Sequence, residues 1–364
     1  MILAAALAFS WVVTGVEPLR TMEYPVGFDS PRLTYARDAR YEYLGTPDGL
    51  WRSERLADPN APLTRVNFPS ESIHDLLVQD ERLYVGKGFA TDAHSFSSTF
   101  IRSDDGGEGV VHLAEGLRDC AGTPECRFMA VTDVEPSLPN HLFVVAGGNL
   151  LSSDDEGETW HQLFRVKDDR GRPTAQICPL KFALIGHTVL LGSECPLDMA
   201  WLHRGSLTDD MTGWLDEPAP VSTPNLENRN IQFIRHTGGN EVWAGTEGGL
   251  LRSNDYGAHF DWALHYALDD ERRYPYIWDM VISTKFPGLV VVSGFDKKQE
   301  NPYVAWSTDG GTTWNDTLAI AGDAVPLLAE DRDGRLLIVT RAGDSFTLGE
   351  LQVAPKNRKR RAVK

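Results

Sequence analysis

The sequence predicts an all-β fold, a seven-bladed β-propeller of four-stranded antiparallel blades, and three observations lead to it. An eight-residue motif, Ser-x-Asp-x-Gly-x-Thr-Trp, occurs at residues 153–160 and again at 307–314. A second phrase, in which a glycine turn separates two short β-rich runs, precedes such motifs and ends at the motif serine. The serines at these positions recur every 47 to 54 residues along the chain. Repeats of about fifty residues that each hold four short strands are typical of β-propellers.

The repeated motif has the composition of a structural turn. Its fixed residues are Ser153, Asp155, Gly157, Thr159 and Trp160 in one copy and Ser307, Asp309, Gly311, Thr313 and Trp314 in the other. Degraded copies begin at Ser103 and Ser253, whereas the serines at 53 and 206 keep the spacing but lack the Asp and Gly. Carboxylate and hydroxyl groups hydrogen-bond the backbone of turns, glycine supplies a positive φ, and tryptophan caps the core of a blade. We therefore expect a structural role for the motif, with no metal bound to it.

Apolar runs ahead of each phrase place seven units, which begin near residues 32, 73, 127, 177, 231, 276 and 324. No long stretch has a 3.6-residue apolar period, so helix is expected to be scarce. The predicted propeller spans residues 32–353. Its last unit shows clear strands only within 324–353, so its fourth strand is either degenerate or supplied by residues 11–16. The second alternative would close the ring and remove two exposed sheet edges.

The two ends of the chain differ in character from the propeller between them. Residues 1–31 are either a signal peptide or the closing strand. Residues 2–16 are apolar, as in a secretory signal, and fall short of the ~20 residues needed to cross a bilayer. Residues 354–364 are rich in Lys and Arg. We expect a disordered basic tail there, and a contact with an anionic surface or partner is the alternative.

Charge and cysteine content bear on partners and compartment. The net charge of −17 argues against a nucleic-acid surface. Four cysteines allow three pairings, and the blade map favours Cys120 with Cys126 and Cys178 with Cys195. Disulfides would indicate an oxidising compartment, so we expect a secreted or periplasmic protein; four free thiols in a cytosolic protein are the alternative. No Cys-x-x-Cys spacing occurs, so we expect these cysteines to hold no metal.

Long connections are predicted to gather on one rim, opposite the motif turns. Hairpins between second and third strands are long at residues 87–98, 193–199 and 295–301, and connections between blades are long at 118–127, 167–176, 218–230 and 268–276. Loops longer than a turn requires are where binding residues concentrate. The candidate ligand-binding residues in and beside these connections are Asp92, His94, Phe96, Arg118, Arg127, Arg229, Asn230, Arg272, Arg273, Tyr274, Tyr276 and Trp278.

The two full motifs resemble those of the Asp-box, or bacterial neuraminidase repeat, β-propeller superfamily, and the resemblance covers about residues 32 to 353. That superfamily includes sialidases, xyloglucan-cleaving glycosidases, sortilin-like receptors and photosystem assembly factors. The resemblance to sialidases implies an arginine triad, a tyrosine nucleophile and an acid/base aspartate. Their Phe/Tyr-Arg-Ile-Pro motif is absent, and residues 29–33 are the nearest stretch. If the chain were a hydrolase, its candidate catalytic carboxylates would be Asp75, Asp133 and Asp279.

These observations favour a non-catalytic propeller that binds a glycan or a protein partner on its loop-rich rim through aromatic and arginine side chains. We expect a secreted or periplasmic monomer with no cofactor, no bound nucleic acid and no integral membrane segment. An exo-acting glycoside hydrolase of sialidase type is the first alternative, and a structural module of a cell-surface assembly is the second. A hydrolase predicts converging arginines or two close carboxylates at the channel mouth, whereas a binding module predicts an exposed aromatic and arginine patch.

Overall fold

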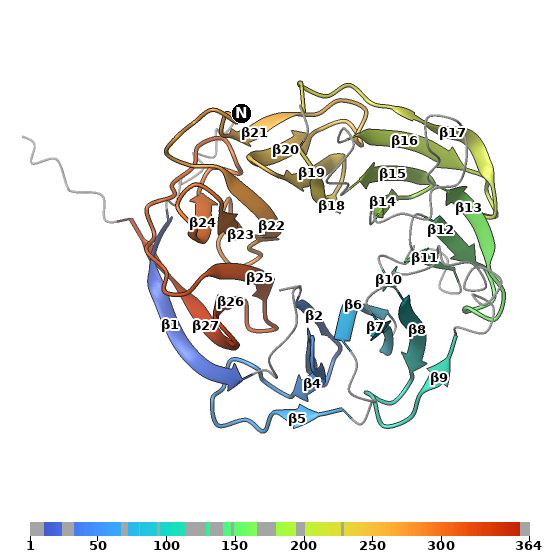
Figure 1. Ribbon diagram of the computed structural model, residues 1–364, viewed down its shortest axis with the longest axis horizontal. Coiled ribbons are helices and arrows are strands. Elements are labelled where there is room, and N and C mark those ends of the chain that lie inside the picture. The colour runs from blue at the N-terminus through green and yellow to red at the C-terminus, as the bar shows by residue number, and fades with distance from the viewer. Residues whose placement is uncertain are drawn as a thin grey trace, which may run out of the picture.

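Seven small antiparallel sheets are arranged in a ring around a central axis (Figure 1). The computed structural model describes residues 11–23, 33–66, 72–79, 81–92, 95–113, 129–131, 141–146, 149–165, 180–193, 201–226 and 229–356. Within each sheet, strands that follow one another in the sequence lie side by side, because short turns connect them. This arrangement confirms the predicted all-β, seven-bladed β-propeller.

The first five blades each hold four strands in sequence order. Blades 1 and 2 contain β2 (Thr34–Arg37), β3 (Glu42–Thr46), β4 (Gly49–Ser53) and β5 (Thr64–Arg65), then β6 (Ser72–Gln79), β7 (Arg82–Asp92), β8 (Ser95–Ser103) and β9 (Val111–His112). Blade 3 contains β10 (Met129–Val131), β11 (Leu142–Ala146), β12 (Asn149–Ser153) and β13 (His161–Arg165). Blades 4 and 5 contain β14 (Leu180–Ile185), β15 (Thr188–Ser193), β16 (Leu202–Leu207) and β17 (Trp214–Pro220), then β18 (Ile231–Gly238), β19 (Glu241–Thr246), β20 (Gly249–Ser253) and β21 (Asp261–His265).

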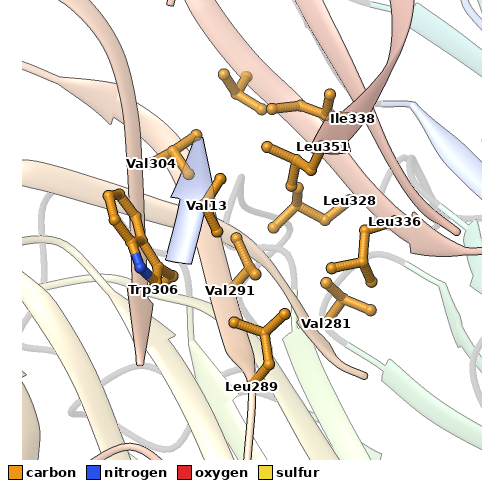
Figure 2. Packing of buried hydrophobic residues seen from close by; sticks show 11 residues of the cluster. Val13, Val281, Leu289, Val291, Val304, Trp306, Leu328, Leu336, Ile338 and Leu351 are labelled. Atoms are coloured by element: carbon orange, nitrogen blue, oxygen red, sulfur yellow. The ribbon is translucent and has the colours of Figure 1, made fainter. Parts of the chain in front are cut away.

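The two ends of the chain meet in blade 7 and close the ring. This blade contains β25 (Ala324–Glu330), β26 (Leu336–Ala342), β27 (Ser345–Pro355) and β1 (Trp11–Glu23). β1 pairs antiparallel with β27 from Trp11 opposite Pro355 to Glu23 opposite Ser345. Val13 of β1 packs in one apolar cluster with Val304 and Trp306 of blade 6 (Figure 2). The N-terminal segment therefore supplies the fourth strand, and paired strands extend beyond the predicted bounds of 32 and 353.

Blade 6 departs from the predicted four strands. It contains three, β22 (Pro275–Ile282), β23 (Val290–Asp296) and β24 (Asn301–Ser307), ordered from the axis outward. In place of a fourth strand there is one isolated antiparallel bridge between Trp306 and Asn315. Within the described part of the chain, the residues that follow Asn315 form no further ladder with β24.

The second strand of a blade approaches its neighbour most closely at a glycine. A Cβ atom on Gly245 of β19 would lie 2.2 Å from Cε1 of Phe233 and 2.6 Å from the carbonyl oxygen of Ile277 in the next blade. Gly45 and Gly192 hold equivalent positions and face an isoleucine of the next blade at similarly short range. The glycine of the repeated phrase is therefore required by the packing of one blade on the next.

Two of the predicted long loops are extended hairpins instead. β7 and β8 continue their pairing as far as Asp92 opposite Ser95, so most of residues 87–98 lie in strands. Similarly, β23 and β24 pair to Asp296 opposite Asn301, which leaves four residues in the turn predicted at 295–301. Pairing satisfies the backbone N–H and C=O groups that a long loop would leave to water. The third such loop, 193–199, lies almost wholly outside the described residues.

Candidate functional site

The rim that carries the hairpins between second and third strands, here called the loop rim, lies opposite the motif turns because consecutive antiparallel turns alternate between the two ends of a sheet. Its described part is concentrated between blades 5 and 6. Of the predicted binding residues, Asp92 and Phe96 are described only in their backbone, within the β7–β8 hairpin. The predicted residues that lie outside the described part of the chain are His94, Arg118, Arg127, Asp133, Cys120, Cys126, Cys178 and Cys195.

Arg229 is a packed cation at the base of this rim. Its side chain is 1% exposed, and its guanidinium carbon lies 5.0 Å from the ring centroid of Trp262 and 5.6 Å from that of Tyr274. One of its N–H groups points to the carbonyl oxygen of Gly248 at 3.5 Å. Its neighbour Asn230 donates a 2.7 Å hydrogen bond to Glu247. The Arg229 side chain thus joins the last strand of blade 5 to the start of blade 6, whereas the bond of Asn230 lies within blade 5, and both side chains offer little surface to a ligand.

Arg273 lies between two carboxylates. Its Nε atom is 3.4 Å from Asp316, and its Nη1 atom is 3.8 Å from Asp296. The Asp296 side chain is fully buried, and its other oxygen accepts the backbone N–H groups of Tyr274 and Lys298 at 3.1 and 3.0 Å. The charge of Arg273 is therefore compensated internally, and Asp296 holds the β23–β24 hairpin against the first strand of blade 6.

Two tyrosines extend this polar cluster. The hydroxyl of Tyr266 donates to Asp316 at 2.8 Å and lies 3.1 Å from the hydroxyl of Tyr303. Burial, together with the Asp316 carboxylate, raises the pKa of Tyr266 to about 12. Asp296, Asp316, Tyr266 and Tyr303 were not among the residues predicted from the sequence, and only the position of Asp296 at the end of a buried strand could have drawn attention to it.

The accessible part of the rim consists of half-buried aromatic rings beside an exposed lysine. Trp278 of β22 stacks on Phe295 of β23, with centroids 6.2 Å apart and planes inclined by 15°. Tyr276 contacts Tyr274 edge-on, and the ammonium of Lys297 lies 5.6 Å from the Tyr276 ring centroid. Contact with the Tyr276 hydroxyl raises the pKa of Lys297, so its positive charge is retained. Arg272 lies nearby, 86% exposed, and pairs with Asp270 at 3.0 Å.

The predicted catalytic carboxylates that the structure describes have structural partners. Asp279 is 7% exposed, pairs with Arg235 of blade 5 at 2.9 Å, and accepts the N–H of Leu328 in blade 7 at 2.7 Å. It therefore joins three blades. Asp75 occupies the equivalent place in β6, beside the same shift in strand register, and accepts the N–H of Leu76 at 2.8 Å. Among the described residues, no group of three His, Cys, Asp or Glu side chains is placed to hold a metal ion.

The motif turns form one repeated net of hydrogen bonds on the opposite rim. In the turns that begin at Ser103, Ser153, Ser253 and Ser307, the serine hydroxyl donates to the aspartate carboxylate at 2.7 to 2.9 Å. The same hydroxyl accepts the N–H of the motif glycine at 2.7 to 2.9 Å. The carboxylate then accepts the N–H of the sixth residue after the serine at 2.8 to 3.0 Å. The degraded copies thus make the same turn as the full ones.

Variation in the motif keeps this net in place. Thr159 and Thr313 each donate their hydroxyl to the second carboxylate oxygen at 2.6 Å, and His259 makes the equivalent contact through Nδ1 to Asp255. Blade 4, where Ser206 was expected to lead, instead forms its turn from Thr208, whose hydroxyl donates to Asp210 at 2.6 Å. The tryptophans of the full motifs, Trp160 and Trp314, each donate from the indole N–H to the motif glycine carbonyl at 3.1 Å.

A cavity of about 440 Å³ lies between the motif turns of blades 5 and 6. Its lining is Arg252, Asn254, Asp255, His259, Asp261, Trp262, Ala263, Gly311 and Thr312. Most of these polar groups already take part in the turn net, as Asp255 and His259 do with each other. The cavity therefore lies where the structure needs its polar atoms for the turns, and of the predicted binding residues Arg229 approaches it through the ring of Trp262, 5.0 Å from its guanidinium carbon.

No family model matches the sequence, and no curated protein does either. The fold is similar to that of YCF48 from Cyanidioschyzon merolae, with a TM-score of 0.60 and 13% identity over 94% of this chain and 99% of that chain. It is also similar to the WD40 β-propeller domain of Doa1, with a TM-score of 0.56, 10% identity, and coverage of 96% and 100%. A chain of the mitotic checkpoint complex gives a TM-score of 0.61 at 10% identity, with coverage of 96% and 95%. The TM-scores show a shared β-propeller fold, and at identities of this size the likeness extends to the fold alone.

The part of the chain that the structure describes contains no helix with the length and hydrophobicity of a membrane span.

Proposed function

We propose that the chain is a non-catalytic propeller of the Asp-box type that binds a glycan or a protein partner on its loop rim between blades 5 and 6. The observation that carries this proposal is the group of half-buried rings, Tyr276, Trp278 and Phe295, beside the exposed Lys297. Aromatic rings next to fixed cations form the centre of many binding surfaces, because they bury apolar area at a small cost in conformational entropy. The protein would act as a secreted or periplasmic monomer without a cofactor.

The described arginines of this rim argue against hydrolysis of the sialidase type. A sialidase presents its arginines to the carboxylate of the substrate, and such an arginine needs an accessible, uncompensated charge. Arg229 is buried between two rings, and Arg273 is shared by Asp296 and Asp316. Asp279 is likewise paired with Arg235. These described residues stabilise the junction between blades, which leaves the aromatic surface as the part able to contact a partner.

A glycan array, with each spot read by mass spectrometry after incubation, tests the proposal. Retained protein with intact glycans supports a lectin-like function, and loss of a terminal sugar would overturn the non-catalytic one. A double variant, Tyr276→Ala with Trp278→Ala, should lose binding while its circular dichroism spectrum stays that of a folded all-β chain. Tyr256→Ala is the matched control, because Tyr256 is 49% exposed but lies on the motif rim.

If no glycan on the array retains the protein, the same variants test whether the ligand is a protein. Cross-linked capture from the secreted or periplasmic fraction of the source cells should then recover a partner with the native chain and the Tyr256→Ala control. The same partner should be lost with the double variant. Equal recovery with all three proteins would show that the aromatic surface is not the binding site.

A further inference from the structure

The outer edge of blade 6 has an incomplete hydrogen-bond ladder. Trp306 of β24 and Asn315 exchange two backbone hydrogen bonds, at 2.8 and 2.9 Å, as the first pair of a fourth strand would. Among the described residues no further ladder bond follows, so β24 remains the outermost strand of its sheet. The other six blades each have a fourth strand at this place.

The direction of the unused groups follows from the pairing pattern. Alternate residues of a strand point their N–H and C=O groups to the same edge. The backbone N–H and C=O groups of Trp306 face Asn315, on the outer edge of β24. The backbone groups of Val304 and Pro302, two and four residues earlier, therefore face the same outer edge. No hydrogen bond to the outward groups of Val304 is present in the described part of the chain, although this residue is only 2% exposed. Pro302 has no N–H and offers only its carbonyl oxygen.

A segment that we call the strap, residues 317–322, follows Asn315 and packs against the apolar cluster that contains Val304 and Trp306. Its burial alternates as in a strand: Leu318 and Ile320 are half-buried against the cluster that contains Val304 and Trp306, whereas the residues between them are exposed. Figure 2 shows Val304 and Trp306 in that cluster. Within the described residues, none of the six strap residues makes a hydrogen bond. Two apolar side chains therefore hold the strap in place.

The strap is fixed at both ends. Asp316 accepts a hydrogen bond from Tyr266 at 2.8 Å, and the N–H of Asp323 donates to the carbonyl oxygen of Arg341 at 2.6 Å. A segment with few buried contacts and solvent-exposed backbone opens at a low local free energy, and firm anchors confine that opening to the segment itself. Displacement of the strap would expose Val304 and the carbonyl of Pro302 without disturbing the ring.

We propose that the outer edge of β24 is a docking site for an extended peptide of a partner protein, which takes the place of the strap and adds the fourth strand to blade 6. The peptide would run antiparallel to β24, with two bonds to Val304 and one to the carbonyl of Pro302. The alternating burial of the strap indicates its chemistry: aliphatic side chains at two alternate positions, where Leu318 and Ile320 now pack. This site is separate from the loop rim and independent of the function proposed there.

The probe is a fluorescein-labelled synthetic peptide that copies residues 315–323, and its binding to the full chain is measured by fluorescence anisotropy. Leu318→Ser with Ile320→Ser loosens the strap, and Thr317→Ser with Ala319→Ser is the matched control at exposed positions. We expect the loosened variant to bind the probe about tenfold more tightly than the control or the native chain. A probe N-methylated at the amides that would face Val304 should bind about tenfold more weakly, because ladder bonds are lost while side chains are kept.

A second variant examines the protein side of the ladder. Val304→Pro removes the outward N–H, as Pro302 already does two residues earlier, and should reduce probe binding in the loosened background. If that variant fails to fold, the N-methylated probe gives the same information with an unaltered edge. In the native chain, the amide of Val304 should exchange with deuterium faster than those of Tyr303 and Ala305, which bond to β23.

Four results would overturn the proposal. Equal binding of the N-methylated and unmodified probes would show that no ladder forms. Failure of the loosened variant to bind the probe would show that the edge is not a docking site. Dimerisation of the loosened variant in light scattering would assign the edge to a second copy. Probe binding that requires removal of residues 1–10 would assign it to the N-terminal segment of the chain itself.

Discussion

Arg252, the last residue but one of β20, donates a 2.9 Å hydrogen bond to the carbonyl oxygen of Gly310 in the motif turn of the next blade. Arg204 makes the same contact with Tyr256 at 3.2 Å, and Arg52 makes it with Gly106. Each acceptor is the third residue after its motif serine, and each has a positive φ between 59° and 72°. This left-handed conformation turns the carbonyl toward the preceding blade, so the motif turn also serves as an acceptor for an arginine.

Replacement of Arg252 by alanine should therefore weaken the junction of blades 5 and 6. The variant loses the bond to Gly310, the ion pair with Glu241 and the contact with Trp243, whose ring centroid lies 4.7 Å from the guanidinium carbon. We expect a loss of about 2 kcal/mol in the free energy of unfolding, measured with urea. Arg272→Ala, at an 86% exposed position, should change it by less than about 0.5 kcal/mol. Equal effects of the two changes would contradict this role.

Asp155→Ala should lower stability without affecting ligand binding. The carboxylate of Asp155 accepts bonds from Ser153, from the N–H of Thr159 and from the hydroxyl of Thr159. Their loss should cost about 1 to 3 kcal/mol, and the same is expected for Asp309→Ala. The exposed neighbour Asp154 gives the control Asp154→Ala. A variant with native thermal unfolding but no binding in the assays of the loop rim would show that the motif itself contacts the ligand.

Gly245→Ala should be among the most destabilising single-methyl changes in the chain. Its Cβ atom would lie 2.2 Å from Phe233 and 2.6 Å from the backbone oxygen of Ile277, which has no room to move within its sheet. Overpacking of this kind costs about 1 to 3 kcal/mol or more. At Gly15 of β1 a Cβ atom would meet nothing within 4 Å, so Gly15→Ala should be neutral or slightly stabilising. Comparison of the two melting temperatures tests the prediction.

The Asp255 carboxylate in the motif turn of blade 5 should make the free energy of unfolding depend on pH under acidic conditions. Burial alone would raise the pKa of Asp255, but the backbone N–H and ring of His259 and the hydroxyl of Ser253 lower it to about 2. Because the folded-state pKa lies below the ordinary value of 3.8, this contribution is present above about pH 3.8 and is lost as the pH falls through 2. Asp255→Asn should therefore be less stable than the native chain near neutrality, and the difference should shrink between pH 4 and pH 2. Asp261→Asn is the control, and a constant difference would refute the linkage.

The predicted disulfides are tested by mass spectrometry of peptides prepared without reduction. We expect Cys178 linked to Cys195 and Cys120 linked to Cys126, because the blade map places each pair in the loops of one rim. Reduction should then lower the melting temperature, since each bridge closes a loop in the unfolded chain. Free thiols at Cys178 and Cys195 would remove the main argument for an oxidising compartment.

The fold could be predicted from the sequence, but only part of the loop rim could. Strands and motif turns are local features, in which Ser153 and Asp155 bond within a few residues, so a repeat in the sequence predicts them directly. The cluster around Arg273 could not be predicted in the same way. Its partners Asp296 and Asp316 lie 23 and 43 positions further along the chain, and nothing in the spacing indicates that they meet.

The amino-acid sequence by itself determined the number of blades, the four-strand pattern of blades 1 to 5 and the turn chemistry, because each depends on groups close together in the chain. Only the tertiary structure decided that β1 completes blade 7, that blade 6 has an open edge beside β24, and that Arg229 and Arg273 are occupied by neighbouring side chains. Those outcomes depend on how one blade packs against the next. In a ring that packing also depends on closure, which joins residues more than three hundred positions apart, such as Val13 and Val353.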